Sequence, residues 1–160
     1  MPPSDDIEIR ELRKDDAPWV QALVEACHEF YALRGSTETS SAEARSLFTS
    51  VPPGAADDDK ILLGAFLQLR LVGVLDLIAR YPQRKEALIA LLLIQPEHRG
   101  CGLGRSLVAA AREEAEAMSL DEIMVNIDPV DRVEPFWEAL DFSLRDARSG
   151  RWGSRVRARS

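Results

Sequence analysis

A glycine-rich turn flanked by two arginines is the stretch of this sequence best suited to chemistry. It reads Arg99-Gly-Cys-Gly-Leu-Gly-Arg105 and lies between an apolar run and an alanine-rich segment with high helix propensity. The unpaired N–H groups at the start of a helix carry the positive end of its dipole and attract anions. Glycines at positions 100, 102 and 104 let a phosphate approach the backbone without meeting a Cβ, and the arginines add full charges. The turn therefore predicts a cradle for a pyrophosphate group.

This turn matches neither of two common nucleotide-binding fingerprints. The Rossmann pattern G-x-G-x-x-G fails because its sixth position is Arg105 when counted from Gly100, and Leu107 when counted from Gly102. That pattern would also follow the first strand of its fold, whereas several expected strands precede this turn. The P-loop pattern G-x-x-x-x-G-K-[ST] is absent from the chain. From the residues alone, the alternative interpretation is also open: the turn would serve only the tight packing of a strand against a helix.

Three carboxylates are candidates for moving a proton. Asp76 lies in the middle of an expected strand, where burial would raise its pKa and suit it to general-base catalysis. On that strand it shares a face with apolar residues: Val72, Val74 and Ile78. A hydrogen-bonded core aspartate that only fixes the strand is the open alternative. Glu86 and Asp128 stand at strand ends, where they would either line a site or be solvated.

Length and composition predict one packed domain over residues 1–160. The chain is 46% hydrophobic and 29% charged, which is typical of a globular protein. The longest apolar run, 87–94, is far shorter than a membrane span, and the acidic start, 1–6, lacks the apolar region of a secretory signal. Cys27 and Cys101 are too few for a disulfide framework or a multi-cysteine metal site. We therefore expect a cytoplasmic protein without a metal or a membrane partner.

The charge of −7 is unevenly distributed along the chain. The last sixteen residues carry a single acid and six arginines: Arg145, Arg148, Arg151, Arg155, Arg157 and Arg159. These arginines alternate with small residues rather than aromatic ones, which is typical of a solvated edge strand. No nucleic-acid partner is expected, since the overall balance is acidic. An acidic domain attracts cationic small molecules at long range, which gives a weak indication of the substrate's charge.

The elements expected around these residues form a mixed α/β sheet. Period-two alternation and apolar runs indicate strands, and apolar stripes at a spacing of three to four residues indicate helices. A tight turn near Leu69-Arg70 should join two strands in a hairpin, and Asp131 should cap a late helix with Glu134 completing a capping box. Strands are expected at 7–13, 61–68, 71–79, 87–94, 121–127, 142–145 and 151–157, and helices at about 16–33, 41–48, 102–119 and 131–140.

Two motifs in this order resemble those of the GNAT acetyltransferase superfamily. Arg99-Gly-Cys-Gly-Leu-Gly104 fits the family's phosphate-binding pattern R/Q-x-x-G-x-G/A. Phe136-Trp-Glu-Ala-Leu-Asp-Phe142 approximates its late-helix pattern F-[YW]-x-x-x-G-F, and the order of elements agrees from Ile7 to about Val156. The chain departs from the family where an asparagine, an alanine, a tyrosine and a glycine are usual: Val130, Val133, Trp137 and Asp141.

The resemblance implies a mixed, mostly antiparallel sheet with helices on both faces and splayed fourth and fifth strands. Acetyl-coenzyme A would enter between those strands, with Cys101 contributing a backbone amide rather than a nucleophilic thiol. The residues expected to bind it are Leu92, Leu93, Ile94, Arg99, Gly100, Cys101, Gly102, Leu103, Gly104, Arg105 and Trp137. Phe30 and Tyr31 fall at the family's acceptor-site lid, although core packing would also explain such aromatics on the first helix.

The function implied is an acetyl-coenzyme A-dependent N-acetyltransferase acting on a small-molecule or peptide amine, with Asp76 as the catalytic base. Family members with a tyrosine in the late helix are expected to protonate the departing thiolate, which Trp137 cannot do. A coenzyme A-binding sensor or inactive module of the same fold is the alternative, motivated by Trp137, Val130 and Val133. The acceptor is not readable from the sequence, and a homodimer is left open.

Overall fold

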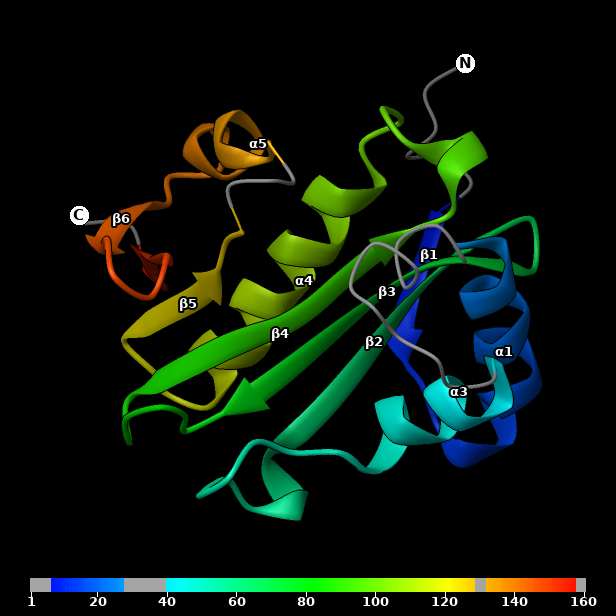
Figure 1. The fold of residues 1–160 in the computed structure, drawn as a ribbon, viewed down its shortest axis with the longest axis horizontal. Helices are drawn as coiled ribbons and strands as arrows, with labels where there is room; N and C mark the ends of the chain where they lie inside the picture. Colours follow the sequence, from blue (N-terminus) through cyan, green and yellow to red (C-terminus); the bar gives the residue numbers. More distant parts are fainter. Residues whose placement is uncertain (1–6, 28–39, 129–131, 158–160) are drawn as a thin grey trace.

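The computed structural model describes residues 7–27, 40–128 and 132–157, which form one seven-stranded sheet and the helices that pack against it. The strands lie in the order β1-β2-β3-β4-β5-β7-β6, and every neighbouring pair is antiparallel except β4–β5. Their bounds are β1 Ile7–Glu11, β2 Lys60–Leu67, β3 Arg70–Ala79, β4 Glu86–Ile94, β5 Glu122–Asn126, β6 Ser143–Asp146 and β7 Arg151–Arg155. The mixed, mostly antiparallel sheet expected from the sequence is confirmed (Figure 1).

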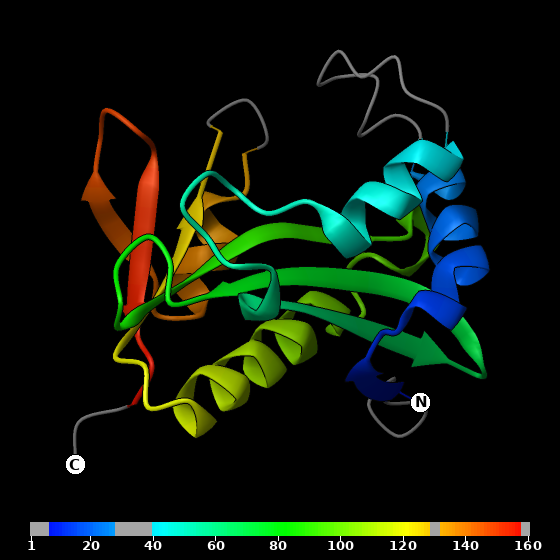
Figure 2. The same cartoon turned by 90° about the horizontal axis from the view of Figure 1, so that it is seen from below.

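Helices cover both faces of the sheet, as Figure 2 shows. On one face lie α1 (Ala17–Ala26) and α3 (Ser40–Thr49), and on the other lies α4 (Leu103–Ala117). The fourth helix, α5 (Glu134–Ala139), contributes Trp137 to the core that α4 covers. Three short 3-10 turns precede α1, β2 and α4: Lys14–Asp16, Asp57–Asp59 and Pro96–His98. Among the described residues, no helix is long and apolar enough to cross a membrane.

The sheet separates two apolar cores. Leu75 and Leu107 belong to the core beneath α4, whereas Val74 and Leu23 belong to the core beneath α1 and α3. Side chains alternate between the faces except at bulges, one of which lies where Ala65 and Phe66 pair with Gly73 and Leu71. Val72 is the extra residue of that bulge and packs beneath α4. The prediction that it shares the face of Asp76 was therefore wrong, because a bulge shifts the alternation by one residue.

Several predicted boundaries differ from the structure by a few residues, and three of the differences concern a helix end, a turn and a cap. The first helix ends at Ala26 with Cys27 as its C-cap, and positions 28–33 of its predicted range lie outside the described residues. The hairpin turn is formed by Gln68 and Leu69, one residue earlier than expected, and both have a positive φ (50° and 69°), which suits a two-residue turn between twisted strands. Glu134 is the first residue of α5 and not the third residue of a capping box. Asp131, its predicted partner, is not among the described residues.

The end of α5 shows why a departure from the family pattern leaves the fold intact. The N–H of Phe142 donates to the Trp137 carbonyl and that of Asp141 to the Glu138 carbonyl, both at 3.0 Å. This is a Schellman motif, and Asp141 holds its left-handed position with a φ of 70°. Aspartate tolerates this conformation better than most residues because its short polar side chain bonds locally. The backbone therefore keeps the conformation for which the family uses glycine.

The left-handed conformation at Asp141 predicts how stability responds to substitution there. Asp141→Val should lower the free energy of unfolding by about 1–2 kcal/mol, because a β-branched side chain clashes with the backbone at positive φ. Asp141→Gly and Asp141→Asn should stay within about 0.5 kcal/mol of the natural chain, since relief of strain is offset by greater freedom in the unfolded state. Urea denaturation measures all three, and equal stability of the valine and glycine variants would contradict the assignment.

Candidate functional site

The candidate site lies where β4 separates from β5. The two strands pair in parallel only from Glu86 opposite Glu122 to Ile89 opposite Val125. Beyond that point β4 continues to Ile94 while the strands diverge (Figure 1). Its pairing with β3 skips Ala90, so a bulge stands where the separation begins. Within the described residues, no strand pairs with the β5-facing edge of β4 along this last stretch. The Ile94 carbonyl accepts hydrogen bonds from Cys27 and Arg99, and the edge before it offers backbone groups to a ligand.

A cleft of about 1450 Å³ fills this separation. Its walls come from β4, the end of β5, the start of α4, α5, the end of α1 and the turn between β6 and β7. The lining residues are Ala26, Cys27, 89–94, Pro96, His98, Arg99, Gly100, 102–105, 125–128, Val133, Phe136, Trp137 and 147–150. Every residue predicted for cofactor binding lines this cleft, apart from Cys101, whose side chain is exposed beside it.

The start of α4 forms the end of the cleft whose geometry suits an anion. Gly100 and Gly102 have φ values of 81° and 84°, in the left-handed region that glycine adopts most readily. Gly102 precedes the first helical turn, whose N–H groups have no carbonyl partner within the helix. A Cβ added at either glycine would meet no described atom within 4 Å, so the space beside the turn is open there. With Arg99 and Arg105 exposed beside it, the turn fits a pyrophosphate.

The α5 side of the cleft is an aromatic wall. The rings of Phe136 and Trp137 meet edge to face at 5.0 Å, and both line the cleft. Trp137 is only 4% exposed. A Cβ at Gly104 would lie 3.1 Å from the Phe136 ring, so this third glycine serves the close approach of α4 to α5. Gly104 thus has a packing role besides the role in phosphate approach expected from the sequence.

Asp76 is not among the residues that line the cleft, although Leu91, its partner across the sheet, is one of them. Its carboxylate forms a buried ion pair. Its Oδ2 is 2.7 Å from Nζ of Lys60, and the two side chains are 8% and 6% exposed. The ammonium also donates to the Ser50 carbonyl at 2.6 Å, which ties the end of α3 to the sheet. Burial raises the pKa of Asp76, and Lys60 opposes that shift. Its Oδ1 is buried and has no hydrogen-bond partner in the described part of the chain. Asp76 faces a lysine rather than the lining of the cleft.

The other predicted residues separate in the structure. Asp128 lines the cleft beyond the end of β5. Glu86 lies at the opposite end of β4, where the strands are still paired. Phe30 and Tyr31 lie outside the described residues. No group of three or more histidine, cysteine or acidic residues within the described ranges could hold a metal ion.

The sequence did not indicate two parts of the lining. Cys27 lies at the end of α1, where its thiol donates to the Ile94 carbonyl at 3.6 Å and where burial raises its pKa. The turn 147–150 reaches the cleft because β7 is inserted between β5 and β6. Beside that turn, Nε of Arg151 donates to Oδ1 of Asn126 at 2.6 Å. Cys27 reaches β4 through the packing of α1, and the turn reaches the cleft through a strand order that differs from the chain order. Neither arrangement leaves a signal in neighbouring residues, so the sequence predicts neither part.

Known proteins resemble the chain in both sequence and structure. A model of the acetyltransferase (GNAT) family matches residues 10–142. An acetyltransferase from Thermus thermophilus is 23% identical with a TM-score of 0.69, covering 93% of this chain and 96% of its own. The PaiA N-acetyltransferase from Thermoplasma acidophilum, in complex with coenzyme A, is 18% identical with a TM-score of 0.70, covering 93% and 98%.

A third solved structure is an aminoglycoside acetyltransferase from an uncultured soil metagenomic sample, in complex with sisomicin. It is 18% identical with a TM-score of 0.69, covering 89% of this chain and 92% of its own. At these identities the likeness shows the fold. No curated protein matches the chain.

The buried ion pair predicts a pH-dependent cost when its cation is removed. A carboxyl group with a raised pKa holds its proton more tightly in the folded state, so the free energy of unfolding falls as pH rises from about 3.9, the unfolded pKa, through the folded pKa. Lys60→Met removes the cation that limits the rise. This variant should lose about 3–5 kcal/mol at pH 7, because an unpaired carboxylate stays buried, and should regain part of that at pH 5.

Urea denaturation at the two pH values measures this effect. The double variant Lys60→Met/Asp76→Leu should recover most of the lost stability at pH 7, since it removes both charges. If the lysine variant loses the same free energy at both pH values, compensation of Asp76 is not the role of Lys60.

Proposed function

Because the chain belongs to the acetyltransferase (GNAT) family, we propose that it transfers the acetyl group of acetyl-coenzyme A to an amine of a small molecule or peptide. The observation that carries this proposal is the cleft, in which an unpaired strand edge meets an open helix start. A long cofactor with one extended amide-bearing arm and one pyrophosphate matches that pair of features. Since acetyl-coenzyme A is a cytoplasmic metabolite, we also propose the cytoplasm as the compartment.

The residues present fit such a cofactor at each part of the cleft. The N–H groups that begin α4 and the side chains of Arg99 and Arg105 would hold the pyrophosphate. The free edge of β4, 90–94, would pair with the amides of the pantetheine arm as a further strand would. Phe136 and Trp137 would pack against the arm from α5. When bound, acetyl-coenzyme A supplies an activated acetyl group as a thioester.

Proton transfer from the acceptor amine is the step that needs a protein base. An amine attacks only when neutral, so a nearby carboxylate, or a water that it holds, must accept its proton. Asp128 lines the cleft, whereas Asp76 pairs with Lys60 and does not. We therefore propose Asp128 as the proton acceptor in place of Asp76.

Release of the thiolate does not require an acid from this chain. Trp137 lines the cleft where the family often has a tyrosine, and an indole N–H does not ionise at physiological pH. An alkyl thiol has a pKa of about 8.5, so its thiolate is already a fair leaving group at neutral pH. Trp137 contributes packing surface, and its burial in the core supports that role.

The acceptor is best described as an amine of a small molecule or peptide. The net charge of −7 is not concentrated in the described part of the cleft, whose charged lining includes Arg99, Arg105 and Arg148 besides Asp128. Long-range attraction by the acidic chain therefore gives little information about this pocket. The sisomicin-bound neighbour supports a small-molecule amine as a first class of acceptor to test.

Trp137 also favours a second candidate, a coenzyme A-binding sensor without turnover. Both candidates bind the cofactor, so binding alone does not separate them. Release of free thiol from acetyl-coenzyme A in the presence of aminoglycosides, polyamines, amino acids and peptide amines would establish transfer. Binding of the cofactor without thiol release above the rate in water for any amine would favour the sensor.

The open space at Gly102 predicts the first test of cofactor binding. Coenzyme A at 100 times its dissociation constant should stabilise the folded chain by about 2.7 kcal/mol, which raises the melting temperature by roughly 5–10 °C. Gly102→Val should abolish this shift, because its side chain would occupy the pyrophosphate position. Gly54→Val is the matched control, since Gly54 also has a positive φ with no atom within 4 Å but lies outside the lining of the cleft. A full shift in the Gly102 variant would overturn the cradle assignment.

The two aspartates predict different kinetics. Asp128→Asn should lower kcat by about 10²–10⁴-fold, and part of this loss should return at high pH, where the amine is already neutral. The KM for acetyl-coenzyme A should change little. Asp76→Asn should leave the pH–rate profile unchanged and act on stability instead. A pH–rate profile altered by the Asp76 substitution, with Asp128→Asn fully active, would return the base role to Asp76.

A further inference from the structure

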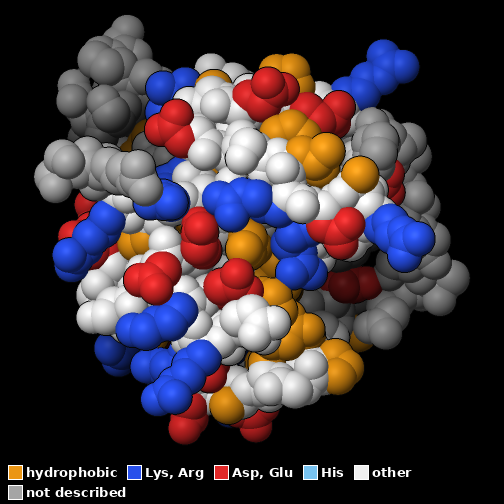
Figure 3. Space-filling model, turned by 90° about the vertical axis from the view of Figure 1, so that its left-hand side faces the viewer, with side chains coloured by type: hydrophobic (Ala, Val, Ile, Leu, Met, Phe, Trp, Pro, Cys, Tyr) orange, Lys and Arg blue, Asp and Glu red, His pale blue; other side chains and the backbone are white. Residues whose placement is uncertain are grey.

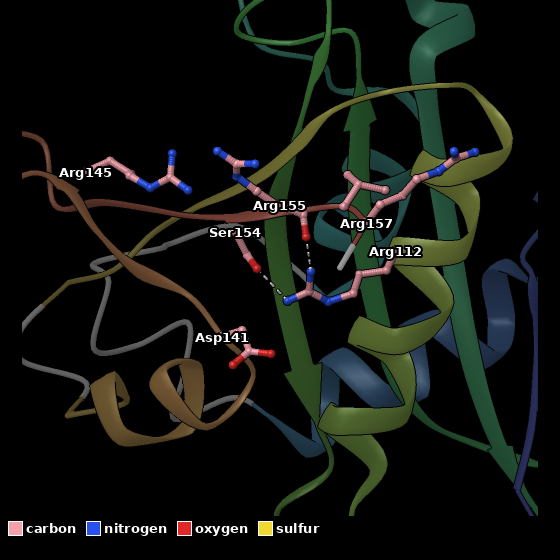
Figure 4. A pocket seen from close by; sticks show the side chains of 7 residues that line it. Arg112, Asp141, Arg145, Ser154, Arg155 and Arg157 are labelled. Atoms are coloured by element: carbon pink, nitrogen blue, oxygen red, sulfur yellow. Dashed lines mark hydrogen bonds between the residues drawn. The ribbon is translucent and has the colours of Figure 1, made fainter. Parts of the chain in front are cut away.

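A second polar network lies outside the cleft and centres on Arg112 of α4. Its Nη1 donates to the Arg155 carbonyl at 2.7 Å and its Nη2 donates to Ser154 Oγ at 2.8 Å (Figure 4). Nη2 also donates to the Leu140 carbonyl. The guanidinium carbon also lies 5.1 Å from the centre of the Phe142 ring. One side chain of α4 thus contacts β7, the end of α5 and the residue just before β6.

The surroundings of Arg112 do not favour an anion site, although other arginines lie close to it. A pocket of about 430 Å³ is lined by Arg112, Arg145 and Arg157 among others. Arg145 pairs with Glu122 at 3.3 Å, and Arg157 pairs with Glu116 at 3.4 Å. Figure 3 shows this side of the molecule, where basic and acidic side chains alternate. The hydrogen bonds of Arg112 go to carbonyl and hydroxyl oxygens of the chain itself, which indicates a structural anchor.

A continuous series of ring contacts connects this anchor to the cleft. Phe142, which Arg112 contacts, meets Trp137 edge to face at 5.0 Å. Trp137 meets Phe136 at the same distance, and Phe136 lies against Gly104 at the start of α4. Phe136 and Trp137 both line the cleft. The anchor and the aromatic wall are therefore two ends of one packed row.

The cleft needs such an anchor because the elements on its far side are weakly attached to β4. Four residue pairs between β4 and β5 are the only strand pairing that joins the two parts of the described sheet. The helix that carries the aromatic wall, α5, has six residues, too few to be stable without tertiary contacts. Its last carbonyls have no partner within the helix, and Leu140, the residue that ends it, receives one from Arg112.

We propose that Arg112 is a positioning residue for the cofactor cleft: through Leu140 and Phe142 it fixes α5, so that Phe136 and Trp137 form a wall for coenzyme A. Arg112 does not line the cleft, so it acts on the cofactor only through α5. This inference rests on the proposed function in so far as coenzyme A is the ligand of the cleft. The main claim of the proposal, that Arg112 places Trp137, applies to the free protein as well.

Calorimetric titration with coenzyme A, well below the melting temperature of each variant, tests the effect on the cleft. Arg112→Met keeps most of the apolar stem but loses all three hydrogen bonds, and it should weaken binding at least tenfold. Arg112→Lys keeps the charge but cannot reach three acceptors, so it should fall between the natural chain and Arg112→Met. If Arg112→Met does not fold, Ser154→Ala, which removes one acceptor, should weaken binding in the same direction by a smaller factor.

Asp16→Ala is the matched control for a general loss of stability. Asp16 forms a two-point ion pair with Arg10, with both bonds at 3.0 Å. It precedes the first residue of α1, whereas the last residue of that helix lines the cleft. This variant should melt earlier than the natural chain yet bind coenzyme A with an unchanged dissociation constant. Unchanged binding in Arg112→Met, or a loss no larger than that of Asp16→Ala, would overturn the proposal.

A signal from Trp137 tests the placement without any ligand. The indole N–H resonance, assigned by its absence from Trp137→Phe, should shift or broaden in free Arg112→Met and stay in place in free Asp16→Ala. A resonance that is unchanged in Arg112→Met would refute the positioning role. Failure of the natural chain to bind coenzyme A would instead overturn the proposed function, and the indole signal would still decide the role of Arg112.

Discussion

The unpaired edge of β4 is the constraint on which the rest of the structure depends. Backbone N–H and C=O groups in the interior of a protein need partners, and a strand in the middle of a sheet normally finds them on both sides. Here β3 satisfies one edge up to Ile94, whereas β5 leaves the other after Ile89. The bulge at Ala90 lies on β4 at the point where β4 and β5 begin to separate. A ligand with its own amide groups is the partner that such an edge fits best.

Opening the sheet in this way weakens the attachment of β5, α5, β6 and β7 to β4, and α4 compensates for it. The first turn of α4 lines the end of the cleft that suits an anion. Its buried side chains, such as Leu107 and Ala111, pack against the sheet. Arg112, one residue further on, holds the end of α5 and β7. One helix therefore connects the anion-binding turn, the sheet and the aromatic wall, which couples the width of the cleft to the packing of the core.

The charged groups of the chain serve two different purposes. Lys60 and Asp76 are buried together beneath the α3 side of the sheet, where each needs the other because an unpaired charge would be strongly unfavourable there. The arginines near the phosphate end of the cleft are exposed and available to an anion. The raised pKa that made Asp76 attractive as a base is a consequence of its burial, and burial also removes it from the lining of the cleft.

The sequence by itself determined the local features of this protein. The glycines and arginines of residues 99–105 specified an anion-binding turn, because glycine permits positive φ and a helix start needs no distant contact to expose its N–H groups. Alternating and apolar runs indicated the order of strands and helices, because the periodicity of side chains is also a property of neighbouring residues. The tertiary structure decided what depends on distant pairing: the insertion of β7 between β5 and β6, the shift of Val72 to the other face, and the burial of Asp76 against Lys60. These features join residues far apart in the chain, and only the completed sheet determines which of them meet.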